Sequence, residues 1–146
     1  GVWISAKKQL PYHIVWRFEW PDAIKNELIS DSNKSGSISI NDLEMAGLLL
    51  TWLVLEETSP INLKHPTIRI FCDNQSTVNW TTKQSTSTST VAGHLLRALG
   101  FRQHLHRTAP LLIAHIKGKE NNMADVASRS FADYKILKSD LKIIIS

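Results

Sequence analysis

The chain has 146 residues, a length that suits one domain with a substantial core and is too short for two full domains. Hydrophobic residues make up 42% and charged residues 21%, close to the globular average, so we do not expect a disordered chain. The formal net charge of +4 is compatible with a polyanionic partner without requiring one. Cys72 is the single cysteine, which excludes an internal disulfide framework and a Cys/His zinc pattern.

The sequence also argues against a membrane or secreted protein. Its longest apolar stretches, such as residues 48–50 and 111–114, are far shorter than the roughly 20 residues that a membrane-spanning helix needs. The N-terminus lacks the basic and apolar regions of a secretory signal. We therefore expect an intracellular protein, cytoplasmic or nuclear, without a membrane partner.

The first part of the chain predicts a hairpin followed by a long helix. Residues 1–5 and 11–18 are rich in Val, Ile, Trp and Tyr and predict an antiparallel hairpin. A polar loop over residues 31–37 leads to a helix that begins near Asn41, which can cap it while Glu44 completes a capping box. Apolar residues at helical spacing predict the buried stripe of this helix: Leu43, Ala46, Leu50, Leu53 and Val54.

The rest of the chain alternates strands and helices. An apolar run over residues 67–72 predicts a buried strand that ends at Asp73. We then expect a short helix through residue 80 and a flexible Ser/Thr-rich connection over 81–90. A helix over 91–106 follows, with Leu95, Leu99 and Leu105 inward, and then a strand over 111–116. A tight loop over 117–120 leads to a helix over 122–130 and a weakly amphipathic last helix over 134–145. This order indicates an α/β fold with helices packed on a mixed sheet, forming a domain over residues 1–130 and a helical tail over 131–146.

Three acids lie where an apolar element ends or turns toward solvent. Asp73 follows the predicted strand, at the end where open α/β sheets place their sites. Glu44 lies in the first turn of a helix between core positions, and Asp125 interrupts a run of apolar and small residues. Taken singly, each acid is also explained as a turn residue, a cap or a favourable charge at a helix N-terminus.

The order and context of these acids carry a family resemblance. Three segments are involved: Asn-Asp-Leu-Glu-Met-Ala-Gly at residues 41–47, Ile-Phe-Cys-Asp-Asn-Gln-Ser at 70–76, and His-Ile-Lys-Gly at 115–118 leading into Asn-Asn-Met-Ala-Asp-Val-Ala-Ser-Arg at 121–129. In this order they resemble the ribonuclease H-like domain attached to reverse transcriptases of eukaryotic retroelements. The resemblance extends to about residue 130.

This resemblance implies a chemistry for the acids. Glu44, Asp73 and Asp125 would join one further Asp in holding two Mg²⁺ ions, with Mn²⁺ as an alternative, about 3.5–4 Å apart across the scissile phosphate. The reaction would be hydrolysis of the RNA strand of an RNA–DNA hybrid, beside the reverse transcriptase domain of the same polyprotein. The resemblance also implies substrate contacts by four amide side chains, each of which a cap or turn explains equally well: Asn41, Asn74, Gln75 and Asn121.

The sequence departs from the family pattern in two places. The loop over residues 117–120 is short and lacks the His that cellular family members carry there. The family's first Asp lies on a central strand ahead of the hairpin, and no acid-bearing strand precedes Val2. We therefore expect a ribonuclease H-like mixed sheet without its first, central strand, and we expect the 146-residue chain to be marginally stable and inactive, or nearly so, as a nuclease.

Other functions remain open at this stage. Integrases and transposases share the fold but order their acids Asp, Asp, Glu, whereas here Glu44 comes first and Asp125 last. A non-catalytic module that positions nucleic acid beside a polymerase is an alternative, although the retained acids argue against decay of the site. A single-strand binder would expose aromatic residues on a sheet, and Trp3, Trp16 and Trp20 fit that role or the packing of a hairpin.

Overall fold

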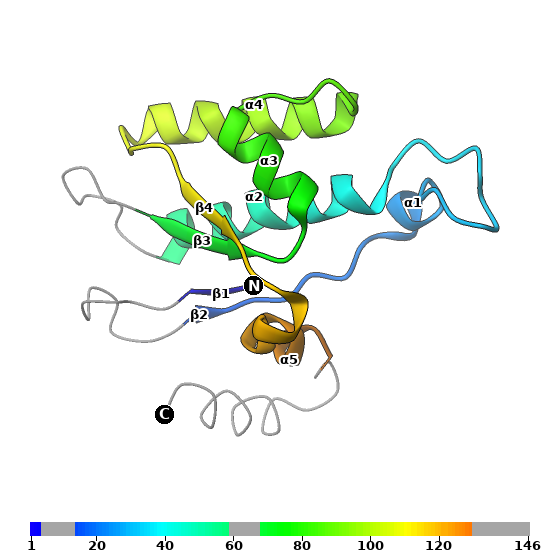
Figure 1. Ribbon diagram of the computed structural model, residues 1–146, viewed down its shortest axis with the longest axis horizontal. Coiled ribbons are helices and arrows are strands. Elements are labelled where there is room, and N and C mark those ends of the chain that lie inside the picture. Colours follow the sequence, from blue (N-terminus) through cyan, green and yellow to red (C-terminus); the bar gives the residue numbers. More distant parts are fainter. Residues whose placement is uncertain (4–13, 59–67, 130–146) are drawn as a thin grey trace. The chain divides into compact units, whose positions relative to one another are not determined.

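The computed structural model describes residues 1–3, 14–58 and 68–129, which belong to two compact units (Figure 1). One unit combines Gly1–Phe18 with Ile116–Ser146, and the other is Glu19–His115. The expected mixture of helices and strands is confirmed, and the described strands form an antiparallel pair and a parallel pair. A single ribonuclease H-like sheet stays a prediction. The expected helix at residues 134–145 lies outside the described residues.

The first unit contains the expected antiparallel strand pair. β1 (Val2–Trp3) pairs with β2 (Ile14–Val15), with Val2 opposite Val15. The Trp16 N–H extends the pairing by donating to the Gly1 carbonyl over 3.0 Å. These bonds confirm the pairing of the predicted hairpin, whose turn lies outside the described residues.

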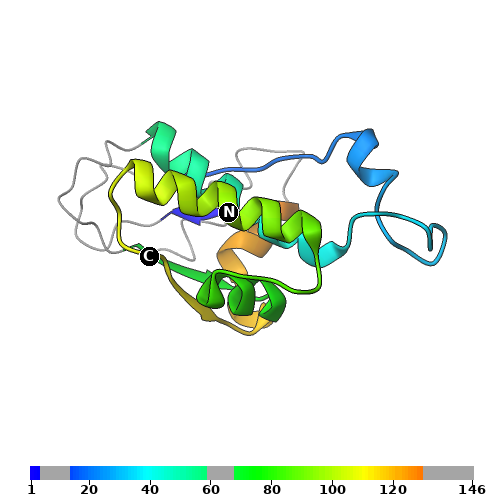
Figure 2. The ribbon, with the colours of Figure 1, turned by 90° about the horizontal axis from the view of Figure 1, so that it is seen from above.

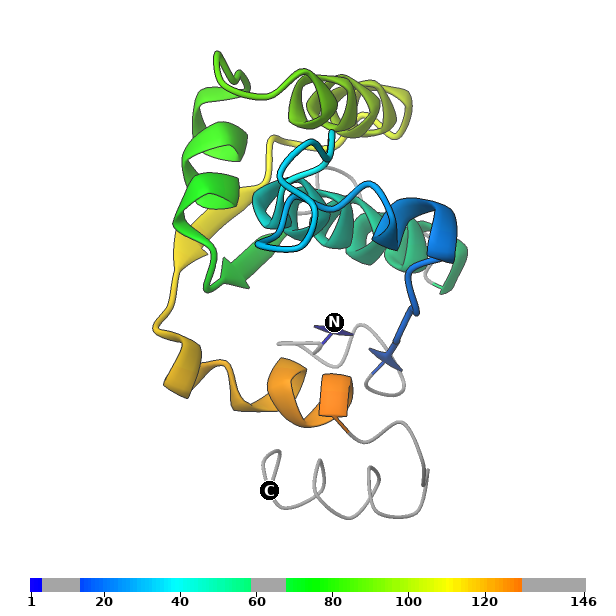
Figure 3. The ribbon, with the colours of Figure 1, turned by 90° about the vertical axis from the view of Figure 1, so that its right-hand side faces the viewer.

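A short helix packs on this strand pair. The 3-10 turn η1 (Gly118–Glu120) occupies the predicted tight loop and is followed by α5 (Asn122–Arg129), as expected (Figure 3). Ala127 is fully buried, and Val15 from β2 packs against it together with Met123 and Val126. A small apolar cluster therefore fixes α5 to the strands.

The second unit begins with α1 (Asp22–Lys25) and a loop that its own hydrogen bonds hold in place. The Asn33 side-chain amide donates to the carbonyl oxygens of Asn26 over 2.8 Å and Leu28 over 3.2 Å. Gly36 lies so close to this backbone that an added Cβ would stand 2.5 Å from the Glu27 oxygen. The predicted polar loop is therefore a closely packed turn that requires glycine at position 36.

The long helix α2 (Ile40–Thr58) begins one residue earlier than predicted and has a different cap. The Ser39 N–H and hydroxyl donate to the Asp42 carboxylate over 2.8 and 2.7 Å, and the Asp42 N–H donates back to the Ser39 hydroxyl over 3.2 Å. This reciprocal pair is the capping box. The predicted box of Asn41 and Glu44 is wrong, because Asn41 already lies inside the helix.

The buried face of α2 is also rotated from the predicted one. The fully buried apolar positions are Met45, Leu48, Trp52 and Leu55. The predicted stripe is only half-buried: Leu43, Ala46, Leu50, Leu53 and Val54. The difference arises because α2 is apolar nearly all round, so spacing alone does not select one face.

Two parallel strands stand beside the helices. β3 (Arg69–Cys72) pairs with β4 (Leu112–His115), with Arg69 opposite Leu112 and Cys72 opposite His115. The prediction of a buried strand before Asp73 is wrong in part, since Arg69 and Phe71 are exposed and the residues between and after them are half-buried. The alternation along β3 shows that one face of this strand packs inward and the other is open, whereas in β4 the two middle residues are half-buried and the end residues exposed.

Two further helices pack on α2 and the strand pair. α3 (Gln75–Lys83) follows β3, and α4 (Thr90–Leu105) lies along α2 (Figure 2). The connection between α3 and α4 is shorter than predicted, because α3 runs to Lys83 and buries Thr81. Leu99 faces the core as expected, but Leu105 is exposed at the end of α4. In residues 1–3, 14–58 and 68–129, no helix has the length and apolarity needed to cross a membrane.

Candidate active site

Two of the three predicted acids, Glu44 and Asp73, lie in the second unit. Glu44 lies near the start of α2, and Asp73 directly follows β3. The pKa of Glu44 is raised from its ordinary value, first because surrounding protein atoms displace water from the carboxyl group and second because of the charge on Asp73. Glu44 and Asp73 are both exposed residues, so solvent and solutes can reach them.

Asn74 connects the elements that carry these two acids. Its side-chain nitrogen donates to the Asn41 side-chain oxygen over 2.8 Å, which joins the end of β3 to the first turn of α2. Its side-chain oxygen accepts from the Thr77 N–H over 2.9 Å and caps α3. Each end of the Asn74 amide therefore makes a structural hydrogen bond, and a substrate contact by Asn74 stays a prediction.

Cys72 and His115 flank the pair on adjacent strands. Burial raises the pKa of the Cys72 thiol, a hydrogen bond from the Asn74 backbone opposes this, and the charges of Glu44 and Asp73 add to the rise. The His115 Nε2 atom lies 3.2 Å from the Asp73 carbonyl oxygen. Because a carbonyl only accepts, the His115 ring donates from Nε2 and helps to fix the backbone at Asp73.

The other predicted amides have different surroundings. Asn41 is half-buried beside Asn74, with its oxygen occupied by the bond just described. Gln75 is exposed, and its side-chain nitrogen donates over 3.0 Å to Asn79 one turn along α3. Gln75 therefore lies at the surface two residues after Asp73, where its carbonyl oxygen faces solvent or a ligand.

The predicted third acid belongs to the other unit. Asp125 is exposed in the first turn of α5, and its N–H donates over 3.0 Å to the carbonyl of Asn121. The backbone carbonyl of Asn121 therefore accepts a hydrogen bond from the first turn of α5. The structure does not fix how the two units lie relative to each other, so the convergence of Asp125 with Glu44 and Asp73 stays a prediction.

The residues that the structure brings together suit a divalent cation in part. Mg²⁺ prefers oxygen ligands and is often held by one or two carboxylates plus substrate phosphates, which Glu44 and Asp73 match. Within the described ranges, no group of three or more His, Cys, Asp or Glu side chains is arranged to hold a metal ion. Two carboxylates alone do not complete a metal site, so a metal-binding role of Glu44 and Asp73 stays a prediction.

Sequence reasoning missed the residue that positions this end of α2. Asp42 is buried beside Glu44 and accepts a hydrogen bond from the hydroxyl of Ser89, which caps α4. The signal was present as Ser39 three residues before Asp42, a capping-box spacing. No protein-family model, curated protein or solved structure matches the chain.

Proposed function

We propose that the chain is the acid-bearing part of a metal-dependent nuclease that hydrolyses the RNA strand of RNA–DNA hybrids within a reverse transcriptase polyprotein. The observation that supports this most is the electrostatic interaction of Glu44 with Asp73 at the carboxyl end of β3. Like charges held together are costly unless a cation or proton compensates them. A pair retained at an open surface therefore favours a cation-binding role.

In this proposal Glu44 and Asp73 hold Mg²⁺, with Asp125 as the third ligand from α5. A metal bound there would supply an activated water and would stabilise the departing oxygen of the phosphodiester. The protein's own contribution is to hold the two carboxylates at a fixed spacing. Asn74 does this by joining α2 to the end of β3, and His115 by its bond to the Asp73 backbone.

Cleavage of a labelled RNA–DNA hybrid tests the proposal. It is measured with the 146-residue chain and with the chain extended by the sequence that its gene encodes upstream, in Mg²⁺ and in EDTA. Glu44→Gln and Asp73→Asn should each lower the rate by more than the roughly 10–100-fold that loss of an outer-shell partner costs. Asp31→Asn, at an exposed loop position, is the matched control.

A second function predicts a different result from the same assay. Within the described residues, no group of three or more His, Cys, Asp or Glu side chains is arranged to hold a metal ion, which a non-catalytic module would also tolerate. Such a module would bind the hybrid with equal affinity in the wild type and in Asp73→Asn. Binding without Mg²⁺-dependent cleavage by either form of the chain would favour the module over the nuclease.

A further inference from the structure

A cavity of about 510 Å³ opens between α3, α4 and β4 in the second unit. These three elements are neighbours in Figure 1. Its walls include residues around the start of β4, whereas Asp73 and His115 stand at the other end of the parallel strand pair. None of the predicted site residues lines the cavity. It is therefore a feature that the acid pair does not explain.

Two glycines leave part of the α4 side of this cavity without side chains. Gly93, Arg97, Gly100 and Gln103 line it at helical spacing, so they share one face of α4. A Cβ added at Gly100 would meet no atom within 4 Å. Glycine inside a helix costs about 0.5–1 kcal/mol relative to alanine, and no close contact requires it at this position. Gly100 is exposed, so the space beside it leaves the cavity accessible from solvent.

The lining combines an apolar floor with a polar rim that carries positive charge. Leu99 and Leu111 are buried at the floor, and Leu96 and Ile113 add to it. Arg97 is the only charged residue of the lining within the described part of the chain. Its guanidinium donates to the His94 ring over 2.7 Å, and no described acid forms an ion pair with it. The site therefore favours an anion.

We propose that this cavity binds a nucleoside monophosphate, either free or as the phosphorylated end of a strand. The apolar floor suits the faces of a base, and Arg97 suits the phosphate because guanidinium binds phosphate oxygens in pairs. The side-chain amides of Gln84 and Gln103 at the rim offer both a donor and an acceptor, as the edge of adenine requires. The volume lies within the 300–1,000 Å³ of typical ligand sites.

Titration of the ¹⁵N-labelled chain with AMP tests the proposal by NMR. AMP should shift the amide signals of Gly93 and Gly100 and bind at least about tenfold more tightly than adenosine or inorganic phosphate, since each of these lacks half of the recognised groups. A (dA)₆ strand with a 5′-phosphate distinguishes the two sources. Tighter binding of this strand assigns the cavity to a strand end, and tighter binding of AMP assigns it to a free nucleotide; both support the proposal.

Two variants with a matched control complete the test. Gly100→Leu fills the cavity while improving helix propensity, and it should abolish the AMP shifts. Arg97→Gln should weaken AMP about tenfold or more and leave adenosine unchanged. Ala98→Leu introduces the same side chain at an exposed position of α4 and should bind AMP like the wild type. Equal affinity for AMP and adenosine, or AMP binding that survives Gly100→Leu, would overturn the proposal.

Discussion

Asp42 and Ser89, which are 47 residues apart in the sequence, join the starts of α2 and α4. The Ser89 hydroxyl donates to the Asp42 carboxylate and at the same time accepts from the Ala92 N–H over 3.0 Å, which caps α4. Asp42 is itself the partner of Ser39 in the capping box of α2, and it is only 4% exposed. A single buried carboxylate therefore fixes both helix starts beside the candidate active site.

Replacing Asp42 with Ala should cost about 2–3 kcal/mol of unfolding free energy, because it leaves the Ser39 N–H and the Ser89 hydroxyl without their charged acceptor. Urea denaturation followed by circular dichroism measures this cost. Asp31→Ala, at an exposed loop position, should change stability by less than about 0.5 kcal/mol. Equal effects of the two substitutions would contradict the double-cap account.

The Asp42 contribution should also depend on pH. Burial alone would raise the pKa of Asp42, but hydrogen bonds from Ser89 and Ser39 outweigh it and leave the pKa below the ordinary 3.8. A lowered folded pKa stabilises the protein above the unfolded value, and the benefit is lost as the pH falls through the folded pKa. The stability difference between wild type and Asp42→Asn should thus be full at pH 6 and shrink below about pH 3.8.

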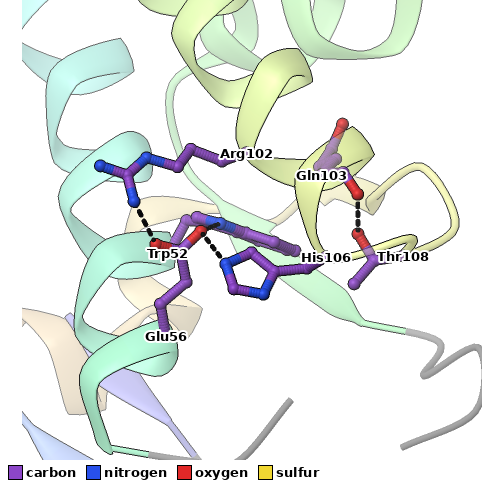
Figure 4. Close-up of polar contacts among 6 residues, drawn as sticks. All are labelled: Trp52, Glu56, Arg102, Gln103, His106 and Thr108. Atoms are coloured by element: carbon purple, nitrogen blue, oxygen red, sulfur yellow. Dashed lines mark hydrogen bonds and ion pairs between the residues drawn. The ribbon is translucent and has the colours of Figure 1, made fainter. Parts of the chain in front are cut away.

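A second polar cluster joins the far ends of the same two helices (Figure 4). The Glu56 side chain is 9% exposed and accepts from Trp52 Nε1 and, over 3.0 Å, from Arg102 Nη1. His106 Nε2 lies 3.3 Å from the same carboxylate. The cluster ties the last turns of α2 to the end of α4.

Removing the Glu56 carboxylate should lower the free energy of unfolding far more than removing the Arg102 guanidinium. Glu56→Ala should destabilise by about 2–3 kcal/mol because it strands the Trp52 indole N–H. Arg102→Ala should cost less than about 1 kcal/mol, since that side chain is 44% exposed. A double-mutant cycle on thermal or urea unfolding measures both values, and a larger loss for Arg102→Ala than for Glu56→Ala would refute the assignment.

The raised pKa of Glu44 gives a third prediction. Asp73→Asn should lower the Glu44 pKa without restoring its ordinary value, because desolvation is the larger cause and Asp73 the second. An acid with a raised folded pKa destabilises the protein once the pH rises above that pKa, so Glu44→Gln should stabilise the metal-free chain at pH 7 and have no such effect at pH 3. Carboxyl ¹³C titration by NMR and thermal unfolding check these two statements, and an unchanged Glu44 titration in Asp73→Asn would exclude the pair.

Asn74 should behave as a link rather than as a simple cap. Asn74→Ser keeps an oxygen that can cap α3 but cannot reach Asn41, so stability should stay within about 0.5 kcal/mol while the Glu44 titration shifts. Asn74→Ala should cost about 1 kcal/mol in addition, through loss of the cap. If the Glu44 titration is the same in Asn74→Ser as in the wild type, Asn74 does not position the acid pair.

The sequence predicted local structure well wherever one segment decides it. The antiparallel pairing of β1 with β2, the extent of α4 and the strand at β4 follow from β-branched runs and from apolar spacing. The predicted capping by Asn41 is wrong because Ser39, three residues before Asp42, forms the capping box with that residue and starts the helix ahead of Asn41. Ser89, far along the chain, adds a second partner for Asp42 that no local pattern predicts.

The candidate site depended on contacts between distant segments and was predicted only in part. The acids and amides were identified by type and order, and their convergence on one site stays a prediction. The hydrogen bond from Asn74 to Asn41, 33 residues away, is a contact between distant segments that local patterns do not predict. Leu105 was expected inside because of its residue type, yet it ends α4 at the surface, 59% exposed.

Paramagnetic broadening by Mn²⁺ tests the central claim most directly, because it detects a cation beside each acid without requiring turnover. Adding Mn²⁺ to the ¹⁵N-labelled chain should broaden the amide signals around Glu44, Asp73 and Asp125 together, and Mg²⁺ in excess should restore them. Asp73→Asn should weaken the effect at all three positions. Broadening at Glu44 and Asp73 that leaves the Asp125 region sharp, or no selective broadening at all, would contradict the proposed nuclease site.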